Sequence, residues 1–279
     1  MKDRTAATRS QQHEIVIDAP VEAVWKAITD GEELTRWFVD AAKVEPGVGG
    51  KFSLSWDGAE AGGSRIDVWE PNQRLRVTLA PFDMGPAKYT ADMAIVEEYT
   101  IERRGGKTVL RLVESGVPNT PEWDGFYDGT NAGWEQFFRT LRHYLERHPG
   151  KPRTTIKIIG KLSGSLDDSW ARLTGAGGLG FEPVAGNMFS TRTGSGETFS
   201  GEVVFSRPPK TLELTLRELD DAFLAHSMSG GGGAQFVYSV LSVFGKTPAE
   251  VEAIRAKWET WLTKVLNVET VAAGNAASC

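Results

Sequence analysis

Aromatic side chains dominate the part of the chain whose residue types could form a binding site. Binding pockets for small molecules are mostly apolar surfaces with a few placed polar groups, so a high density of Trp, Phe and Tyr favours an apolar ligand. Taken singly, each ring is better explained as an ordinary core residue, but together they suit the lining of a cavity. The residues that we expect to line it are Phe52, Trp56, Trp69, Tyr99, Trp123, Phe126, Tyr127, Trp134, Phe137 and Phe138.

Polar groups that could orient a ligand are fewer. The segment VPNTPEWDGFYDGTNAGW mixes large aromatics with Asp124, Asp128 and Asn131. In a loop it would suit the mouth of a cavity. The alternative is a helix lead-in whose Asp and Asn side chains cap backbone amides, and the sequence leaves both open.

Three charged residues, Arg65, Glu97 and Arg111, fall on expected strands. Strand alternation does not fix the face that they take, because apolar residues flank them on both sides, and we take them as exposed. An inward Glu97, Asp124 or Asp128 with a burial-raised pKa would instead indicate an acid or base, and hence an enzyme.

Motifs for metal, nucleotide or nucleophilic chemistry are missing from the sequence. The histidines are scattered, with His143 and His148 five positions apart on a helix, and zinc-site spacing does not occur. Neither a GxSxG elbow nor a P-loop is present, and the glycine run Gly230 to Gly233 joins two strand-like pieces. We therefore assign no catalytic residue, no metal site and no cofactor.

Composition narrows the class of protein further. The chain has 279 residues, 40% hydrophobic and 24% charged, which fits a globular protein of two domains. A net charge of −6 disfavours a nucleic-acid partner, and no apolar run is long enough for a membrane span. The polar N-terminal segment lacks the apolar region of a secretory signal, so we expect a cytoplasmic location.

The expected elements run strand, helix, antiparallel sheet and long helix. Residues 14–17 alternate as a strand does, and apolar residues recur at helical spacing over 21–28. Short β-branched runs between 51 and 114 lie too close together for parallel crossovers, so their sheet is antiparallel. Residues 133–146 carry the apolar stripe of a long amphipathic helix. Such a sheet and helix pack economically as a curved sheet wrapped around the helix.

The second half of the chain repeats the first. EPGVGGKFS at 45–53 shares five of nine residues with EPVAGNMFS at 182–190, an offset of 137, while the offset is 145 upstream and 124 downstream. The last helix of the second copy opens with a capping box formed by Thr247 and Glu250. The repeat equates Trp25 with Trp170 and Trp134 with Trp258.

The expected fold class is therefore α+β, with two tandem helix-grip domains, each a curved antiparallel sheet wrapped around a long C-terminal helix. We place the first domain at residues 11–150 and a second, degenerate one at 151–270, with flexible tails at 1–10 and 271–279. In the second copy a short TGAGGLGF replaces the helical EELTRWFVDAA. We expect its pocket to be reduced and its role to be that of a scaffold or an interaction surface.

Four ordered motifs of the first half resemble the START-like superfamily (SRPBCC, birch-pollen-allergen-like), and within it the homologues of the heat-shock-chaperone ATPase activator. They are HEIVIDAPVEAVWKAITDGEELTRWF, KVEPGVGGKFSLSWDG, IDVWEPNQRLRVTL and GWEQFFRTLRHYLE. The resemblance implies a helix-grip fold around an apolar cavity, used across the superfamily for lipids, steroids, aromatic polyketides and other hydrophobic ligands. The eukaryotic namesakes act on a chaperone through an additional N-terminal domain that has no counterpart in this sequence.

These observations lead us to expect a cytoplasmic protein that holds a small hydrophobic ligand in the cavity of the first domain, with binding rather than catalysis as its task. One alternative is a chaperone-associated or protein-interaction module of the stress response, whose partner is a chaperone or another protein. A second is a cyclase-like enzyme of the same superfamily. An exposed apolar patch would favour the partner, and an inward acid the enzyme.

Overall fold

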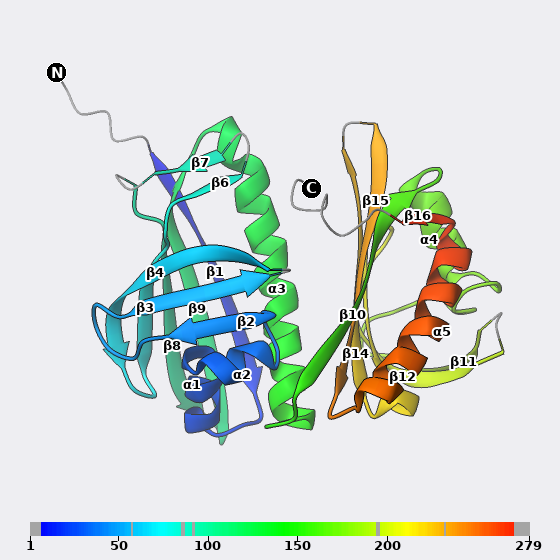
Figure 1. The fold of residues 1–279 in the computed structure, drawn as a ribbon, viewed down its shortest axis with the longest axis horizontal. Helices are drawn as coiled ribbons and strands as arrows, with labels where there is room; N and C mark the ends of the chain where they lie inside the picture. The colour runs from blue at the N-terminus through cyan, green and yellow to red at the C-terminus, as the bar shows by residue number, and fades with distance from the viewer. Residues whose placement is uncertain are drawn as a thin grey trace. The chain divides into compact units, whose positions relative to one another are not determined.

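The computed structural model divides into two compact units, residues 1–150 and 151–279. Each unit has a seven-stranded antiparallel sheet and a long helix near its C-terminal end (Figure 1). The α+β fold of two tandem helix-grip domains predicted from the sequence is confirmed. The residues that the structure describes are 7–56, 58–84, 87–90, 93–193, 196–231 and 233–270.

The first unit consists of one large sheet, a small hairpin, two short helices and the long helix. Its elements are β1 (Thr8–Ile17), α1 (Val21–Thr29), α2 (Gly31–Thr35), β2 (Ala41–Val44), β3 (Lys51–Trp56), β4 (Ala59–Glu70), β5 (Arg74–Thr78), β6 (Phe82–Met84), β7 (Ala87–Tyr89), β8 (Val96–Arg104), β9 (Lys107–Pro118), a 3-10 turn η1 (Pro121–Trp123) and α3 (Asp124–Arg147). The strand order in the large sheet is β1-β9-β8-β5-β4-β3-β2, and β6 pairs with β7.

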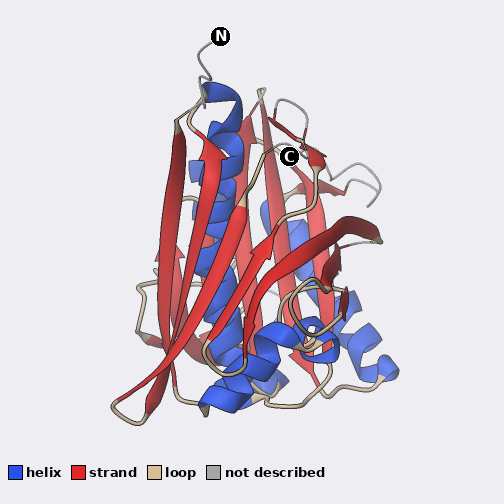
Figure 2. Ribbon diagram, turned by 90° about the vertical axis from the view of Figure 1, so that its left-hand side faces the viewer, coloured by secondary structure: helices blue, strands red, loops and turns tan. Residues whose placement is uncertain are grey.

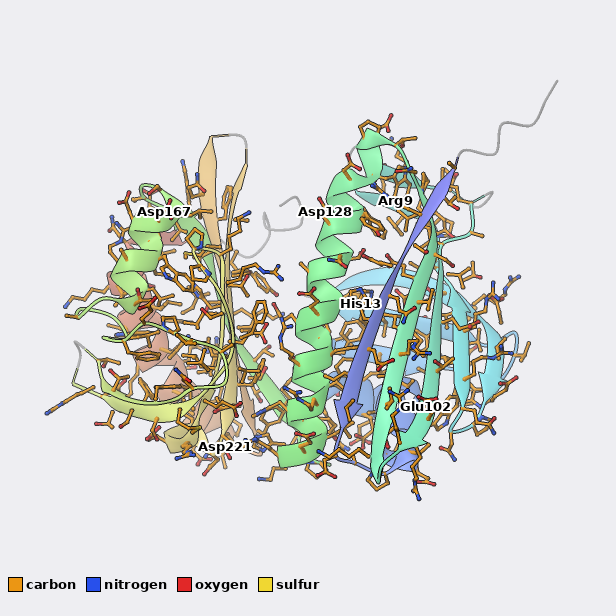
Figure 3. All side chains as sticks on the ribbon, turned by 180° about the vertical axis from the view of Figure 1, so that it is seen from behind. Arg9, His13, Glu102, Asp128, Asp167 and Asp221 are labelled. Atoms are coloured by element: carbon orange, nitrogen blue, oxygen red, sulfur yellow. The ribbon has the colours of Figure 1, made fainter. Side chains whose placement is uncertain are left out.

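The inner face of this sheet is the one that α3 covers. Ile15 and Ile17 on β1 are buried while their neighbours in sequence are exposed, as strand alternation requires. His13 faces α3 from the same strand, with its ring 6.3 Å from that of Phe138 (Figure 3). Phe138 and Leu141 lie on the buried stripe of α3. Figure 2 shows the long strands of this unit bending around the helix.

Polar contacts fix helix α2 and the residues beside it in the first unit. The Asp30 carboxylate caps its N-terminus by accepting from the Glu33 backbone amide at 3.0 Å. The buried Tyr144 hydroxyl on α3 donates to Glu33 Oε2 at 2.5 Å. Just beyond α2, Trp37 Nε1 donates to the carbonyl of Ala27 at 2.9 Å. These contacts hold the segment that follows α2 against α1 and α3.

The second unit repeats this plan with a shorter connection after its first helix. Its elements are β10 (Arg153–Leu162), α4 (Leu166–Thr174), β11 (Met188–Arg192), β12 (Thr198–Arg207), β13 (Thr211–Leu216), a 3-10 turn η2 (Arg217–Leu219), β14 (Ala222–Gly231), β15 (Ala234–Phe244), α5 (Pro248–Leu266) and β16 (Val268–Thr270). The strand order is β11-β12-β13-β14-β15-β10-β16. The predicted capping box is confirmed, because the Thr247 and Glu250 side chains each bond the other's backbone amide.

Some element boundaries differ from the sequence expectation. β1 begins at Thr8, well before the alternating residues 14–17 that indicated it, because Thr8 and Arg9 pair with the end of β9. α3 begins at Asp124, so Asp128 lies inside the helix and not in a loop at a cavity mouth. β16 was not predicted. Residues 1–6 and 271–279, most of the expected tails, lie outside the described residues.

Candidate functional site

An aromatic cluster centred on Phe38 joins the segment after α2 to β3 and α3. The Phe38 ring centroid lies 4.6 Å from that of Phe137 and 5.3 Å from that of Trp56. It lies 5.5 Å from that of Trp134, which in turn contacts further rings on β8 and α3. The predicted lining residues that meet in this cluster are Trp56, Tyr99, Trp134, Phe137 and Phe138.

The other predicted lining residues lie elsewhere. Trp123, Phe126 and Tyr127 pack with the β6–β7 hairpin in a separate cluster, because η1 and the first turn of α3 carry them there. Trp69 packs edge-on against Trp25, with 5.2 Å between the rings, and Phe52 is buried on β3. The expectation of one lining made from all these residues is therefore corrected to two clusters with two residues outside them.

A row of polar side chains crosses the inner face of the first sheet. Glu114 on β9 lies directly opposite Gln11 on β1 and opposite Glu97 on β8, so the three side chains share one face. We call Gln11, Glu114 and Glu97 the carboxylate row. Gln11 Nε2 donates to Glu114 Oε2 at 2.5 Å, and Thr130 Oγ1 on α3 donates to the same oxygen at 3.0 Å.

The expectation that Glu97 is exposed is wrong. Glu97 is half-buried and lies on the same face as Tyr99, two positions along β8, because alternate residues of a strand share a face. The Tyr99 hydroxyl donates to Glu97 Oε2 at 2.8 Å. Among the described residues Glu97 has no other hydrogen-bond partner, so Oε1 is left free. Arg65 is exposed as expected, and Arg111 pairs with Glu14 at 2.6 Å.

The electrostatics of the carboxylate row favour a protonated Glu97. Burial raises its pKa to about 8, the negative charge of Glu114 adds to the effect, and the hydrogen bond from Tyr99 opposes it. Burial also raises the pKa of Glu114, against hydrogen bonds from Gln11, Thr130 and Trp134 that favour its charged form. At neutral pH Glu97 is therefore mostly neutral and can donate a hydrogen bond through its free oxygen.

Sequence reasoning missed Phe38, Gln11, Glu114 and Thr130 as members of the site. A signal existed for two of them. Counting back in steps of two from the apolar end of β1 puts Gln11 on the buried face, and the same count along β9 puts Glu114 there. The position of Thr130 depended on the start of α3, which the sequence placed too late.

The second unit lacks the carboxylate row. The repeat offset of 145 equates Gln11 with Ile156, which pairs with Leu241, and Leu241 pairs with Leu224. Leu241 and Leu224 therefore occupy the places of Glu114 and Glu97. The next strand checks this alignment independently, since the residues beside Glu97 and Leu224 are Val77 and Leu214, related by the offset of 137.

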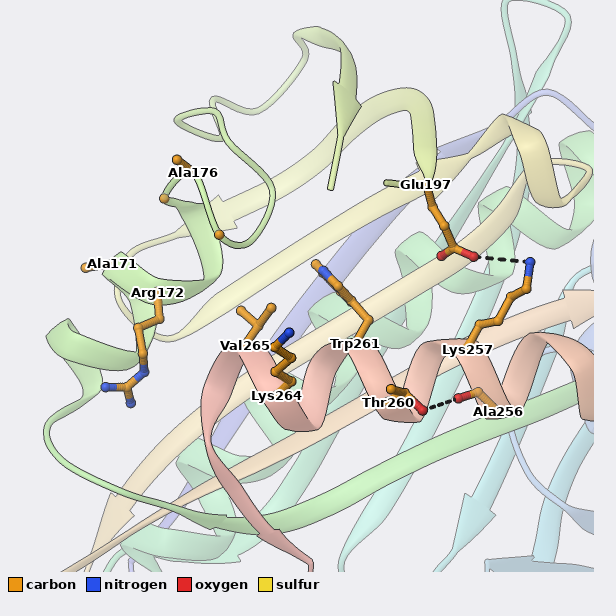
Figure 4. Close-up of a pocket in the computed structure, with 12 residues that line it drawn as sticks. Ala171, Arg172, Ala176, Glu197, Ala256, Lys257, Thr260, Trp261, Lys264 and Val265 are labelled. Carbon is orange, nitrogen blue, oxygen red and sulfur yellow. Dashed lines mark hydrogen bonds and ion pairs between the residues drawn. The ribbon is translucent and has the colours of Figure 1, made fainter. Parts of the chain in front are cut away.

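A hollow of about 840 Å³ lies in the second unit, lined by α4, α5, the turn 175–177 and Glu197 (Figure 4). A smaller pocket of about 280 Å³ lies in the same unit around Phe189. Both of these pockets lie in the second unit, whereas we expected the larger pocket in the first. In the first unit Phe38 packs among the other rings of its cluster, and the second unit has a turn in place of α2.

Two further findings concern the residues that the structure describes. Within them, no three His, Cys, Asp or Glu side chains gather as metal ligands would. None of their helices is long and apolar enough to cross a bilayer.

A family of known proteins matches the first unit in sequence. The sequence profile of the activator of Hsp90 ATPase homolog 1-like proteins matches residues 18–146. Residues 18–146 are therefore similar to this family. The match spans most of the first unit, including Phe38 and Glu97, and no curated protein matches the chain.

Some solved structures match about half of the chain, and others match nearly all of it. A Mesorhizobium loti protein is 29% identical over 50% of this chain and 98% of its own, with a TM-score of 0.45. The Aha1 dimer protein of Colwellia psychrerythraea is 20% identical over 51% and 99%, with a TM-score of 0.43. The di-domain ARO/CYC BexL of the BE-7585A biosynthetic pathway is 15% identical over 93% and 98%, with a TM-score of 0.42.

Proposed function

We propose that the first unit binds a small, largely apolar molecule that carries a hydrogen-bond acceptor such as a ketone oxygen. The ligand lies against the inner face of the sheet beside α3, and Glu97 makes the polar contact. The observation that carries this proposal is the carboxylate row, with a neutral Glu97 whose Oε1 is free, on a face that is otherwise mainly apolar and aromatic.

The two carboxyl groups of the carboxylate row are expected to destabilise the fold. Two carboxyl groups directly opposite each other on neighbouring strands repel when charged, and each loses hydration on burial. The second unit forms the same fold with leucines at both positions. The helix-grip fold therefore does not need these groups, and carboxyl groups whose pKa is raised at such a position are candidates for function.

The surroundings of Glu97 suit such a ligand. The Tyr99 hydroxyl fixes one carboxyl oxygen, which leaves the other to face a ligand. Tyr99 contacts Trp134, and Trp134 contacts Phe137, so an aromatic surface extends from the polar group. Phe137 and Glu97 are only half-buried, which supports access to this surface from solvent.

The test uses two naphthalenes of nearly the same shape. 2-Acetylnaphthalene carries a ketone acceptor and 2-ethylnaphthalene does not, and binding of each is followed through the tryptophan fluorescence of the full chain. We expect the ketone to bind about 5-fold more tightly, the value of one good hydrogen bond. Glu97→Leu, which copies the second unit, should remove the difference.

Two variants serve as controls. Glu97→Gln keeps a neutral donor, so it should retain the preference for the ketone, while wild-type binding of the ketone weakens above about pH 8 as Glu97 ionises. Glu98→Gln changes the adjacent side chain, which lies 3.8 Å from Arg76 on the other face, and should have no effect. Equal affinity for the two naphthalenes in wild type would refute the proposed polar contact.

A second candidate function is acid–base catalysis. A half-buried carboxyl with a pKa of about 8 can transfer its proton to a ligand carbonyl at neutral pH and take one back. Enolisation of 2-acetylnaphthalene would exchange its methyl protons for deuterium in D₂O, which proton NMR detects as loss of the methyl signal. Exchange no faster with wild type than with Glu97→Leu argues for binding alone.

A further inference from the structure

The hollow of the second unit lies where the first unit is filled. We call it the α4–α5 pocket, lined on α4 by Ala171 and Arg172, on the turn by Ala176 and on α5 chiefly by Trp261 and Lys264. Its volume of about 840 Å³ is within the range of pockets that hold small organic ligands. Figure 4 shows the walls that α4, the Ala176 turn, Glu197 and α5 contribute to it.

The repeat explains why the space is open. The offset of 124 equates Phe137 with Trp261, and in the first unit Phe137 is covered by the Phe38 ring at 4.6 Å. The second unit has the glycine-rich turn from Gly175 in place of α2 and Phe38. Trp261 therefore lines a space at the place where Phe38 contacts Phe137 in the first unit.

The residues that line the pocket also differ in charge from their equivalents in the first unit. Arg172, Lys257 and Lys264 line the pocket, and the repeat offsets equate them with three uncharged residues of the first unit. Those residues are Ala27, Gly133 and Thr140. A helix face that is only exposed to solvent needs polar side chains, and acidic residues would serve there as well as basic ones. Three cations with a single carboxylate, in a protein of net charge −6, favour an anion.

The three cationic side chains of the pocket differ in their partners, and one of them is available to a ligand. Lys257 pairs with Glu197 at 3.2 Å, and Arg172 donates to the neutral oxygens of Ser163, Ser169 and Leu266. Lys264 is exposed and has no ion-pair partner within the described part of the chain. It lies on α5 beside Trp261, one turn of helix away, so a charge at Lys264 and an apolar body on Trp261 can belong to one ligand.

An unpartnered donor strengthens this assignment. Trp261 is 4% exposed, and its Nε1 has no hydrogen-bond partner among the described residues. In Figure 4 its ring extends from α5 toward the space between the Ala176 turn and Glu197, with the nitrogen near its tip. A buried N–H without an acceptor is costly, and a ligand oxygen is one way to satisfy it.

We propose that the α4–α5 pocket binds a small amphiphilic anion, a molecule with an aromatic or aliphatic body and one carboxylate. The carboxylate is held by Lys264, and the body lies on Trp261 and the alanine side chains of the two helices. This site is separate from the one proposed at Glu97, and its existence does not depend on it.

Isothermal titration calorimetry of the full chain with two matched probes tests the proposal. Naphthalene-2-carboxylate and naphthalene-2-carboxamide have nearly the same size, but only the first is charged. We expect the carboxylate to bind with one-to-one stoichiometry and to lose about 5-fold in affinity in Lys264→Thr, the residue of the first unit at this place. Lys210→Thr removes the same charge from an exposed turn outside the pocket and should have no effect.

Two more variants locate the binding. Ala256→Trp places a large ring on the exposed surface of α5 that lines the pocket, and should abolish binding of the carboxylate. Glu97→Leu should leave that binding unchanged, which separates this site from the first unit. The proposal is overturned by equal binding of carboxylate and carboxamide, by equal losses in the two lysine variants, by unchanged affinity in Ala256→Trp, or by the absence of saturable binding.

Discussion

Replacing Glu97 by Leu should make the first unit more stable, by an amount that grows with pH. The folded-state pKa of about 8 exceeds the ordinary 4.5, so folding takes up a proton between these values. A group whose pKa is raised by folding stabilises the folded state fully at pH values below its unfolded-state pKa. This stabilisation is lost as the pH rises through its folded-state pKa. The stability of the wild type therefore falls as the pH rises across this window. Glu97→Leu has no carboxyl group at this position and does not show this fall.

The magnitude follows from the shift. Each pH unit within the window costs about 1.4 kcal/mol, so the wild type should lose roughly 3 kcal/mol between pH 5 and pH 7 relative to Glu97→Leu. Above pH 8 the pH-dependent part of the stability difference should level off near about 5 kcal/mol, the value of the whole shift. Few single substitutions stabilise a protein by this much, which makes the effect easy to detect.

The assay is urea unfolding at pH 5, 7 and 9, with hydrogen exchange of the β8 peptide, residues 96–104, to identify the transition of the first unit. Glu98→Leu is the matched control, because it removes the neighbouring carboxyl from the other face of the same strand. A difference between wild type and Glu97→Leu that stays constant with pH would refute the placement of Glu97 as a buried carboxyl with a raised pKa.

Three other substitutions have expected outcomes. Phe38→Ala should cost about 3–5 kcal/mol in urea unfolding because it leaves a cavity among the surrounding rings, and Phe38→Leu should cost clearly less. Tyr144→Phe should cost about 1–3 kcal/mol, since the buried Glu33 loses a donor, and a negligible cost would show that the hydrogen bond does not form. Thr247→Ala should cost about 1 kcal/mol by breaking the capping box, whereas Thr247→Ser should be nearly neutral.

The elements of the fold could be predicted because many of their signals are local. The capping box at Thr247 and the apolar stripe of α3 depend only on nearby residues, and both are present. The tandem arrangement could be predicted from the repeat, because matching residues in the two halves of the sequence indicate matching helices and strands.

The site could be predicted only in part, because it depends on which residues meet across the sheet. Tyr99, Trp134 and Phe137 were identified by their type, but Trp123 belongs to another cluster because η1 carries it there. Glu97 is flanked by Val96, which is also buried, so burial on both faces of β8 concealed the alternation that would have placed it inward. The sequence shows TGAGGLGF in place of EELTRWFVDAA, but it did not predict the pocket that lies between α4 and α5.

The short strand β16 has a consequence for the solubility of the second unit. β10 pairs with β15 on one side, and β16 covers the other side through Gly160, Lys161 and Leu162. An uncovered sheet edge offers unpaired backbone groups to other chains and promotes aggregation. A chain shortened after Asn267 would keep the whole of α5 yet expose this edge of β10, and should self-associate as concentration rises. The last strand thus protects part of the edge of β10, in addition to placing Val268 in the core of the second unit.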